Sequence, residues 1–547
     1  MTSQNLKLKV KGNSDYETEI IDSLNYKKTH LDFNSIKHEV NSIQKKLYKI
    51  GYIENKRSLI EKINDSTFIT QFQLKNKFDS LYIYYNKNSI DPQILNSISK
   101  NIFDDYFIIN FNKAESVLNF INSKISNQGL PFSKLRLSNI EITKSNSLKA
   151  ELIIESKTKE RSISNIIIKG YEKFPHSYLK HYLKIKPNQP FNLNSIKRKT
   201  ERLNDLKFAN QIKAPEVLFS KDSTSLYIYL EKSKSNAFDG FLGFGTNEET
   251  NNLEFDGYLN LNLTNNLNFG ESFKLLYKSD ENDQKTFDTE LTLPYIFKSP
   301  IGVDLQLQIF KRDSSFTTVN QSAKLHYQIN SKHKIYAGLT NLESNNLLTE
   351  NISSNNITDY KTSYYSFAYE FLKPQSYNYL FPINSKLYFE TNFGKRKLTN
   401  ESLKQSQFII DAVKTFNLNL KNSIYLKLNG STLISDTYLE NELFRFGGIN
   451  SIRGFEENSL LASSFGIINS EYRLQVTNSI YIHSIIDAAY FENKNLNTKE
   501  KLFGYGFGFG ILTKAGLLKF NYANGKIENQ KFKLANSKIH ISITTDF

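Results

Sequence analysis

From residue 236 to its C-terminus the chain alternates between hydrophobic and polar positions with a period of two. Leu305, Leu307 and Ile309, for example, are separated by glutamines, and the same alternation recurs over 538–544. Because successive side chains of a strand point to opposite faces, each such segment has one apolar and one polar face. The pattern predicts an all-β region without helices.

About sixteen of these segments follow one another, beginning near residues 237, 253, 271, 285, 302, 317, 333, 360, 385, 405, 423, 464, 479, 501, 516 and 538. Short connections alternate with a set that has longer members, such as 341–358 and 435–463. An even strand number, alternating loop lengths and aromatic strand ends are typical of outer-membrane barrels. A soluble β-sandwich is the alternative, but sixteen strands that each keep a polar face fit a water-filled lumen better. We therefore expect residues 236–547 to form a 16-stranded antiparallel transmembrane barrel.

The first part of the chain predicts three α+β units of the order β-α-α-β-β, at 1–78, 79–158 and 159–235. The third unit is the clearest, with a strand at 164–170, helices near 178–183 and 194–206, and strands at 214–220 and 225–231. In the upstream units the helices are expected near 14–24, 33–49, 92–101 and 113–128. Small sheets of this kind have open edges that can accept a strand from another chain, although a rigid spacer is an equal interpretation.

The composition limits the chemistry. The 547 residues include no cysteine, which excludes disulfides, thiolate metal sites and thiol catalysis. A net charge of +15 permits acidic partners such as nucleic acid or anionic lipid, but the charges are spread along the chain and indicate a lysine-rich solvated surface. No apolar run approaches the ~20 residues of a membrane-spanning helix. The start, MTSQNLKLKV, lacks the pattern of a signal peptide, which indicates either a cytoplasmic protein or a signal that has been removed.

One glycine-rich stretch, Phe444 to Leu460 (FRFGGINSIRGFEENSL), interrupts the alternating pattern. It contains the pair Gly447-Gly448 and then Arg453, which lies between Ile452 and the pair Gly454-Phe455. A charged residue between apolar anchors and glycines indicates a loop folded into an enclosed space, with its arginine bound to a carboxylate. A solvated loop is the alternative.

Two carboxylates on the predicted lumen face are candidate partners for Arg453. Glu471 shares one face of the twelfth segment with Asn469 and Arg473, and Asp487 shares one face of the thirteenth segment with His483. A partly desolvated arginine strongly favours contacts with carboxylates.

The fourteenth segment, LFGYGFGFGIL, puts four aromatic residues on one face and four glycines on the other: Gly504, Gly506, Gly508 and Gly510. The strict period of two and the absence of a following helix argue against a nucleotide-binding loop. Glycines on the lumen face instead leave room for a segment to lie against the wall.

These features resemble the BamA/TamA superfamily of outer-membrane assembly factors (the bacterial surface antigen family), whose periplasmic units are called POTRA domains. The most specific element is the glycine pair followed by the arginine–glycine–aromatic triplet. The resemblance implies that this loop folds into the lumen and that Arg453 contacts Glu471 and Asp487. Three units before sixteen strands are most similar to TamA-like members, since BamA has five and two-partner secretion transporters have two. Phe547 resembles the aromatic end of an outer-membrane targeting signal, although the residues before it lack the usual glycine.

The resemblance implies a Gram-negative outer-membrane protein with periplasmic POTRA domains, whose signal peptide has been removed. It implies assembly or insertion of other proteins, with unfolded outer-membrane proteins, outer-membrane lipid and a periplasmic partner (TamB-like or a lipoprotein) as partners, and no nucleic acid. The seam between the first strand, about 237–246, and the last, 538–547, would open toward the bilayer. Gly240, Gly243 and Gly245 weaken that first strand. Export of a passenger through the lumen and lipid transfer with a periplasmic bridge protein remain alternatives.

No catalytic constellation accompanies these features, so we expect neither an enzyme nor a cofactor. The eight histidines are scattered, and the chain has no nucleophile elbow or phosphate loop. His176 and His181 are interpreted as a pair on a helix surface, and His483 as a hydrogen-bonding residue of the lumen.

Overall fold

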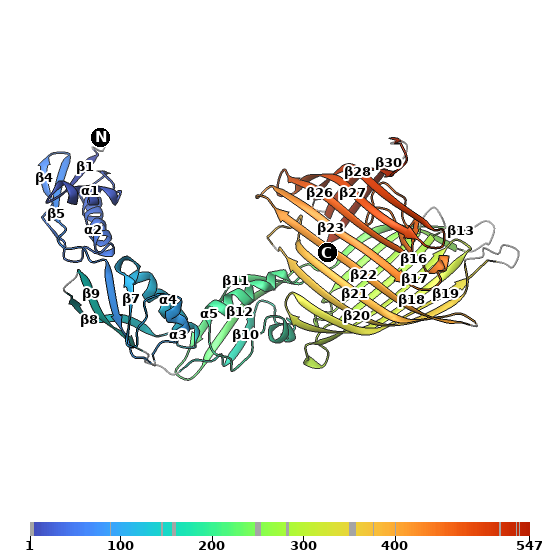
Figure 1. Ribbon diagram of the computed structural model, residues 1–547, viewed down its shortest axis with the longest axis horizontal. Coiled ribbons are helices and arrows are strands. Elements are labelled where there is room, and N and C mark those ends of the chain that lie inside the picture. Colours follow the sequence, from blue (N-terminus) through green and yellow to red (C-terminus); the bar gives the residue numbers. More distant parts are fainter. Residues whose placement is uncertain are drawn as a thin grey trace. The chain divides into compact units, whose positions relative to one another are not determined.

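The computed structural model describes residues 5–87, 89–143, 146–155, 160–246, 253–279, 284–348, 357–375, 377–399, 401–513, 516–531, 533–534 and 537–546, and side chains are not described for 241–246, 253–256 and 542–546. Contacts divide the chain into two compact units, of which the first is mainly Met1–Ser164 and the second contains Asn165–Pro187, Ile196–Phe219 and Ser225–Phe547 (Figure 1). The three domain boundaries drawn from the sequence remain predictions.

The first compact unit begins with a sheet of order β2-β1-β5-β3, with β4 also paired to β5. Its elements are β1 (Leu6–Gly12), α1 (Asp15–Ser23), β2 (Thr29–His30), α2 (Phe33–Lys49), β3 (Lys56–Arg57), β4 (Glu61–Asn64) and β5 (Thr67–Gln73). Apolar residues of α2 recur at helical spacing, and Ile36, Val40, Ile43 and Leu47 are fully buried against the sheet. Asp32 accepts a hydrogen bond from the backbone of Ser35 and so caps the start of α2.

A second sheet, of order β7-β6-β9-β8, follows in the same unit. Its elements are β6 (Ser80–Tyr84), α3 (Pro92–Asn96), β7 (Tyr106–Asn110), α4 (Ala114–Asn127), β8 (Lys134–Ile142) and β9 (Ser147–Glu155). Strand β7 corrects the sequence interpretation, which passed directly from one helix to the next. The segment YFIIN is too short to show a clear period, and it becomes a strand because Phe107 and Ile109 are buried in the core beside β6.

The second compact unit starts with a three-stranded sheet of order β10-β12-β11. Its elements are β10 (Asn165–Lys169), a π-helix at Tyr178–Tyr182, α5 (Leu193–Thr200), a 3-10 helix at Glu201–Asp205, β11 (Ala209–Phe219) and β12 (Thr224–Lys232). The helix predicted at 194–206 is therefore two shorter pieces. Pro215 lies within β11, which the sheet tolerates because β11 is an edge strand.

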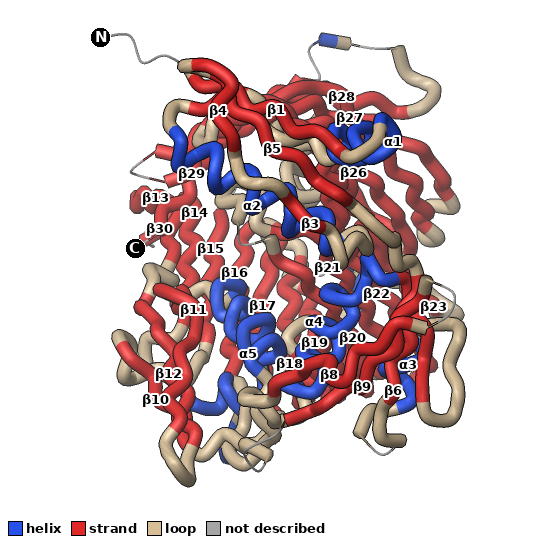
Figure 2. The backbone as a smooth tube through the Cα atoms, turned by 90° about the vertical axis from the view of Figure 1, so that its left-hand side faces the viewer, coloured by secondary structure: helices blue, strands red, loops and turns tan. Residues whose placement is uncertain are grey.

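The rest of the second unit is a closed barrel of sixteen antiparallel strands, which confirms the predicted fold class. The α-helices of the described residues all precede it in the sequence. In Figure 2 the helices are blue and the barrel strands are red. The strands are β13 (Ala237–Thr246), β14 (Leu253–Thr264), β15 (Ser272–Ser279), β16 (Gln284–Leu293), β17 (Ile301–Arg312), β18 (Phe316–Asn330), β19 (His333–Asn346), β20 (Tyr360–Pro374), β21 (Ile383–Lys397), β22 (Ser402–Asn417), β23 (Asn422–Ile434), β26 (Ser464–Gln475), β27 (Ile480–Asn493), β28 (Thr498–Thr513), β29 (Gly516–Ile527) and β30 (Ser537–Asp546).

Alternation along each strand separates the two faces of the barrel. On β27, Ile482 and Ile486 are about half exposed on the outer face, whereas Tyr481, His483 and Asp487 are buried on the inner face. An apolar outer band with a polar interior is the arrangement expected of a barrel in lipid. No helix of the described residues is long and apolar enough to cross a membrane.

The barrel closes where β13 meets β30, and this seam is short. Within the described parts of the two strands, the paired residues are Ala237 with Asp546 and Phe238 with Thr545. By comparison, β13 pairs with β14 over its entire length, from Ala237 to Thr246. Over most of their described length, β13 and β30 therefore have no regular pairing with each other.

Candidate functional site: a loop folded into the barrel lumen

The glycine-rich stretch lies between β23 and β26, in the connection that spans residues 435–463. Its two arms pair as a small antiparallel ribbon, β24 (Phe444–Phe446) with β25 (Leu460–Ala462). The tip between these arms carries Arg453. Gly454 has a φ of 92°, and a Cβ at this position would lie 2.4 Å from the backbone nitrogen of Gly525 on β29. Only glycine allows both this backbone conformation and so close an approach to the wall.

Arg453 binds both of the predicted carboxylates. Its Nε and Nη2 donate to the two oxygens of Asp487 at 2.8 and 2.6 Å, and its Nη1 donates to Glu471 Oε1 at 2.5 Å. The backbone N–H of Arg453 also donates to Asp487 Oδ2, at 3.1 Å. The side chains of Arg453 and Asp487 are 6 % and 0 % exposed, so the pair is cut off from bulk water. A bidentate arginine–carboxylate pair fixes geometry as well as charge.

A second arginine completes the charge balance of this cluster. Arg473 donates through Nε to the other oxygen of Glu471, at 2.7 Å. Two guanidinium groups therefore face two carboxylates, and no net charge is left buried. A buried cluster of this kind contributes little net stability compared with apolar residues, but removing one partner leaves an uncompensated charge.

Apolar contacts anchor the loop beside its arginine. Ile452 and Phe446 are buried in a cluster formed by the loop and the inner wall, together with Ala462, Ile467, Ala489, Phe491 and Leu502. The ring of Phe446 stacks on Phe465 with centroids 4.8 Å apart, and Phe455 packs against the edge of the cluster.

The glycines of β28 lie on the inner wall directly beside β27. A Cβ on Gly504 would lie 2.4 Å from the carbonyl oxygen of Arg453, so the loop lies directly on this glycine. At Gly508 and Gly510 the space is taken by the rings of His483 and Tyr481 from β27, and at Gly506 a Cβ would meet the backbone of Tyr522. His483 is buried and lies 2.9 Å, through Nε2, from Asn521 Oδ1.

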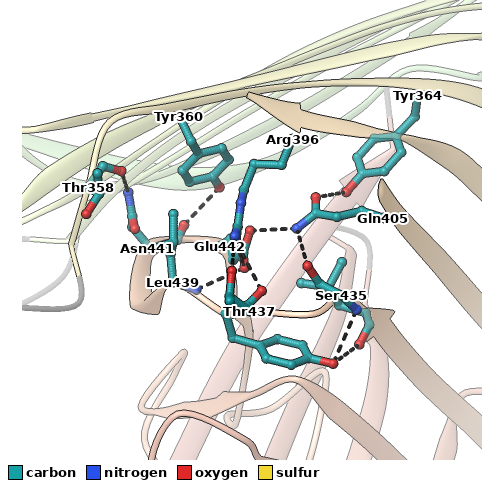
Figure 3. A network of polar contacts seen from close by, with 12 residues as sticks. Thr358, Tyr360, Tyr364, Arg396, Gln405, Ser435, Thr437, Leu439, Asn441 and Glu442 are labelled. Carbon is teal, nitrogen blue, oxygen red and sulfur yellow. Dashed lines mark hydrogen bonds and ion pairs between the residues drawn. The ribbon is translucent and has the colours of Figure 1, made fainter. Parts of the chain in front are cut away.

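A second buried arginine, which the sequence analysis did not single out, holds the base of the same loop. Arg396 of β21 is fully buried and donates to the carboxylate of Glu442 and to Thr437 (Figure 3). Gln405 of β22 donates to Glu442 Oε2 at 3.0 Å and accepts from Tyr364 of β20 at 2.9 Å. The available signal was weak: Arg396 shares the inward face of its strand with Asn392, but it lies within the basic run GKRK.

The loop also reaches the far side of the barrel. Arg445 lies over the rings of Phe310 and Phe316 on β17 and β18, at 4.3 and 4.7 Å. Asn441 donates to Ser344 of β19 at 2.9 Å. The connection therefore crosses the lumen rather than covering only the strands it joins.

At the other end of the barrel a short turn folds inward as well. Residues 375–382 join β20 to β21, and Leu380 and Phe381 of this turn are buried against Tyr481 of β27. Three strands, β22, β23 and β26, separate β21 from β27. The ring of Phe381 lies 4.8 Å from that of Tyr481, in an edge-to-face arrangement. The period-two pattern ends at Pro374, so nothing in the sequence indicated this inward turn.

The three-stranded sheet contacts the same end of the barrel. Tyr178 donates to Gly270 O at 3.1 Å, and its ring packs edge-to-face on Tyr295. Burial raises the pKa of Tyr178 well above its usual range. His181 donates through Nε2 to Lys298 O at 2.9 Å and is buried, whereas His176 is exposed. The interpretation of these histidines as a surface pair is therefore wrong for His181, because the barrel covers that side of the π-helix.

The remaining predicted residues belong to the seam. Gly240, Gly243 and Gly245 all lie in β13. Gly240 has a φ of 150°, and a Cβ at this position would lie 2.2 Å from the carbonyl oxygen of Tyr258 on β14. Phe547 lies outside the described residues. Among the residues that the structure describes, no group of three or more histidine, aspartate or glutamate side chains is arranged to hold a metal ion.

Comparison with known proteins gives the family. Residues 258–547 match the Omp85 superfamily domain, and residues 162–232 match the POTRA surface antigen variable number repeat. No curated protein matches the chain in sequence.

Solved structures show the same fold. CdiB from Escherichia coli has a TM-score of 0.55 at 12 % identity, covering 93 % of this chain and 98 % of its own. CdiB from Acinetobacter baumannii has a TM-score of 0.54 at 15 % identity, covering 85 % and 89 %. BamA from Haemophilus ducreyi lacking POTRA domains 1–3 has a TM-score of 0.50 at 15 % identity, covering 85 % and 99 %. Similarity at these identities shows the fold alone.

Proposed function

The chain belongs to the Omp85 superfamily of outer-membrane proteins, and from that premise we propose that it is a TamA-like assembly factor that inserts other proteins into the outer membrane. Its barrel would lie in the outer membrane and its POTRA units in the periplasm. No step of this function makes or breaks a covalent bond, and the chain is not an enzyme.

The short seam is the observation that carries the proposal. Two residue pairs join the described parts of β13 and β30, although each strand is ten residues long. Lipid offers no partner to a free N–H or C=O group, so an unpaired strand edge in the membrane favours addition of another strand. A substrate strand that pairs with β13 or β30 would satisfy those groups while it enters the bilayer.

The POTRA units supply further strand edges for the earlier step. In the described sheets, β8 (Lys134–Ile142) and β11 (Ala209–Phe219) are edge strands of nine and eleven residues. Ile140 and Ile142 of β8 are more than half exposed. An extended segment of an unfolded outer-membrane protein, or of a TamB-like or lipoprotein partner, would bind such an edge by strand addition.

A reversible disulfide across the seam tests the proposal. Phe238 and Thr545 are direct partners in neighbouring antiparallel strands, where Cα atoms lie about 4.5–5.5 Å apart, within the range that a disulfide spans. Because the chain has no cysteine, the introduced pair Phe238→Cys with Thr545→Cys is the only thiol pair present. The matched control introduces a cysteine pair elsewhere in the barrel, Ile468→Cys with Ala488→Cys, because these residues are direct partners in β26 and β27.

Both variants would be reconstituted in liposomes and assayed for insertion of an unfolded outer-membrane protein, for passenger export and for lipid transfer. We expect the seam disulfide to abolish insertion and a reductant to restore it. The control disulfide should have no effect on insertion. Full insertion with the seam locked would contradict it. Loss of passenger export or of lipid transfer without any insertion activity would favour one of those alternatives instead.

A further inference from the structure

Two consecutive glutamates at the tip of the lumen loop bind opposite sides of the seam. Glu456 Oε1 lies 3.0 Å from Lys538 Nζ, and Lys538 belongs to β30, the last strand. Glu457 Oε1 lies 3.5 Å from Lys278 Nζ, and Lys278 belongs to β15, the third strand. Neither contact is part of the arginine cluster described above.

The register places Lys538 on the stretch of β30 for which the described residues show no pairing to β13, and places Lys278 two strands behind β13 on the other side of the seam. The seam pairs involve Thr545 and Asp546, and Lys538 lies seven residues earlier on the same strand. At about 3.4 Å per residue, this separation is roughly 24 Å along β30. Lys278 pairs with Tyr258 of β14, which in turn pairs with Phe241 of β13. Lys278 is therefore fixed to the first-strand side of the seam and Lys538 to the last-strand side.

The tip that carries Glu456 and Glu457 is fixed by contacts of Arg453 and of the pair Gly447-Gly448. Arg453 is three residues before Glu456 and is bound to β26 and β27. A Cβ on Gly447 would lie 2.4 Å from the carbonyl oxygen of Glu456, and one on Gly448 would meet the carboxylate of Glu457. The glycine pair thus allows the base of the loop to pack directly against the two glutamates. A movement of the loop would move both carboxylates together.

The two ion pairs are weak enough to break and re-form when the seam opens and closes. The side chains are 39 % and 59 % exposed in the Lys538–Glu456 pair and 30 % each in the Lys278–Glu457 pair. Ion pairs with this much exposure are weak and are screened by salt. The pairs therefore add to closure of the seam without making it permanent.

We propose that Glu456 and Glu457 form an electrostatic staple across the seam, so that the lumen loop holds closed the stretch where β13 and β30 are not paired. The staple rests on the proposed function in one respect, namely that opening of this seam serves insertion. Opening separates β30 from β15 and must break at least one of the two ion pairs. Withdrawal of the loop from the lumen would break both ion pairs at once. The position of the loop therefore controls whether the seam between β13 and β30 is held closed.

The full-length protein in lipid nanodiscs tests the staple by electron spin resonance. Spin labels on Ile539→Cys of β30 and Leu259→Cys of β14 report the width of the seam, and neither residue belongs to the staple. The glutamates are replaced as Glu456→Gln and Glu457→Gln, which keep their shape. Glu528→Gln is the matched control, because Glu528 forms an exposed ion pair of 2.9 Å with Lys501 that does not cross the seam.

We expect each glutamine substitution to raise the fraction of molecules with a wide seam about two- to fivefold, as for the loss of an exposed ion pair, and the control to leave it unchanged. Charge exchange gives the sharper result: Glu457→Lys should widen the seam, and Glu457→Lys with Lys278→Glu should restore it. An unchanged seam in all glutamate variants, or no recovery on charge exchange, would overturn the staple. Insertion activity is measured separately, so a seam that widens without a change in insertion would leave the staple standing and contradict the proposed function.

Discussion

The guanidinium of Arg473 lies between two aromatic rings, 4.6 Å from the centroid of Phe381 and 3.8 Å from that of Tyr425. Phe381 comes from the inward turn at one end of the barrel, while Arg473 binds Glu471, one of the two carboxylates that hold the loop from the other end. The inward turn and the lumen loop are therefore linked through Arg473. Cation–π contacts of this kind strengthen when they are shielded from water.

Replacement of Phe381 tests this link. We expect Phe381→Ala to lower the free energy of unfolding of the barrel by about 3 kcal/mol, because it removes a buried ring and one face of the Arg473 contact. Tyr379→Ala is the control in the same turn, since Tyr379 is 84 % exposed and should change stability by less than ~0.5 kcal/mol. Urea unfolding followed by tyrosine fluorescence measures both. Equal effects of the two substitutions would contradict the link.

The contact of Arg396 with Glu442 at the base of the lumen loop gives a second prediction. Arg396→Ala leaves Glu442 buried without its cation, and we expect a loss on the order of 3–5 kcal/mol in the free energy of unfolding. A double variant, Arg396→Met with Glu442→Leu, should recover most of this loss, because both charges are then removed. Lys397→Ala, the exposed neighbour on the outer face, should have no measurable effect. If the double variant were as unstable as the single one, the charge pairing would not be the cause.

The substitution Gly504→Ala adds a methyl group to the lumen wall and tests whether the loop must lie directly against that wall. In Gly504→Ala the new Cβ would lie 2.4 Å from the carbonyl oxygen of Arg453, so the loop must shift. We expect a cost of about 1–3 kcal/mol and faster protease cleavage within 447–458. At Gly466 of β26, two strands away from β28, a Cβ meets nothing within 4 Å, which makes Gly466→Ala the matched control. Equal cleavage rates for both variants would show that the loop does not depend on this contact.

The joint between the three-stranded sheet and the barrel should weaken in acid. Burial lowers the pKa of His181, and its Nε2 donates to Lys298 O. Since the folded pKa is below the unfolded value of about 6.5, the neutral form stabilises the joint above that pH, and the stability is lost as the pH falls below it. Hydrogen exchange of the Tyr178–Tyr182 amides should therefore be faster at pH 5.5 than at pH 7.5, relative to the amides of α2. His181→Gln should remove this pH dependence, and equal protection of the wild-type protein at both values would contradict the assignment.

The barrel was predictable because its signal is long and regular. Alternation over sixteen segments gives the strand count, and observed strands begin within about three residues of the positions read from the sequence. The same alternation of side chains along the strands places Glu471 and Asp487 on the inner face, where Arg453 can reach them. The family resemblance supplied the role of the loop.

What the sequence did not show depends on contacts between distant segments. Arg396 and Glu442 lie 46 positions apart, and neither has a local feature that distinguishes it from a solvated charge. Phe381 lies in a turn of mixed polar and aromatic residues, and it is buried because it packs against Tyr481, four strands away around the barrel. Strand β7 is equally inconspicuous, because five residues are too few to show a period.

The cationic side chain of Arg453 joins the lumen loop to the barrel wall, and the free energy of unfolding of Arg453→Ala tests this role most directly. The substitution leaves Asp487 and Glu471 without the guanidinium that binds both, and the predicted loss is on the order of 3–5 kcal/mol, with faster protease cleavage of the loop. A variant whose unfolding free energy stays within ~0.5 kcal/mol of the wild type, with the loop equally protected, would contradict the account.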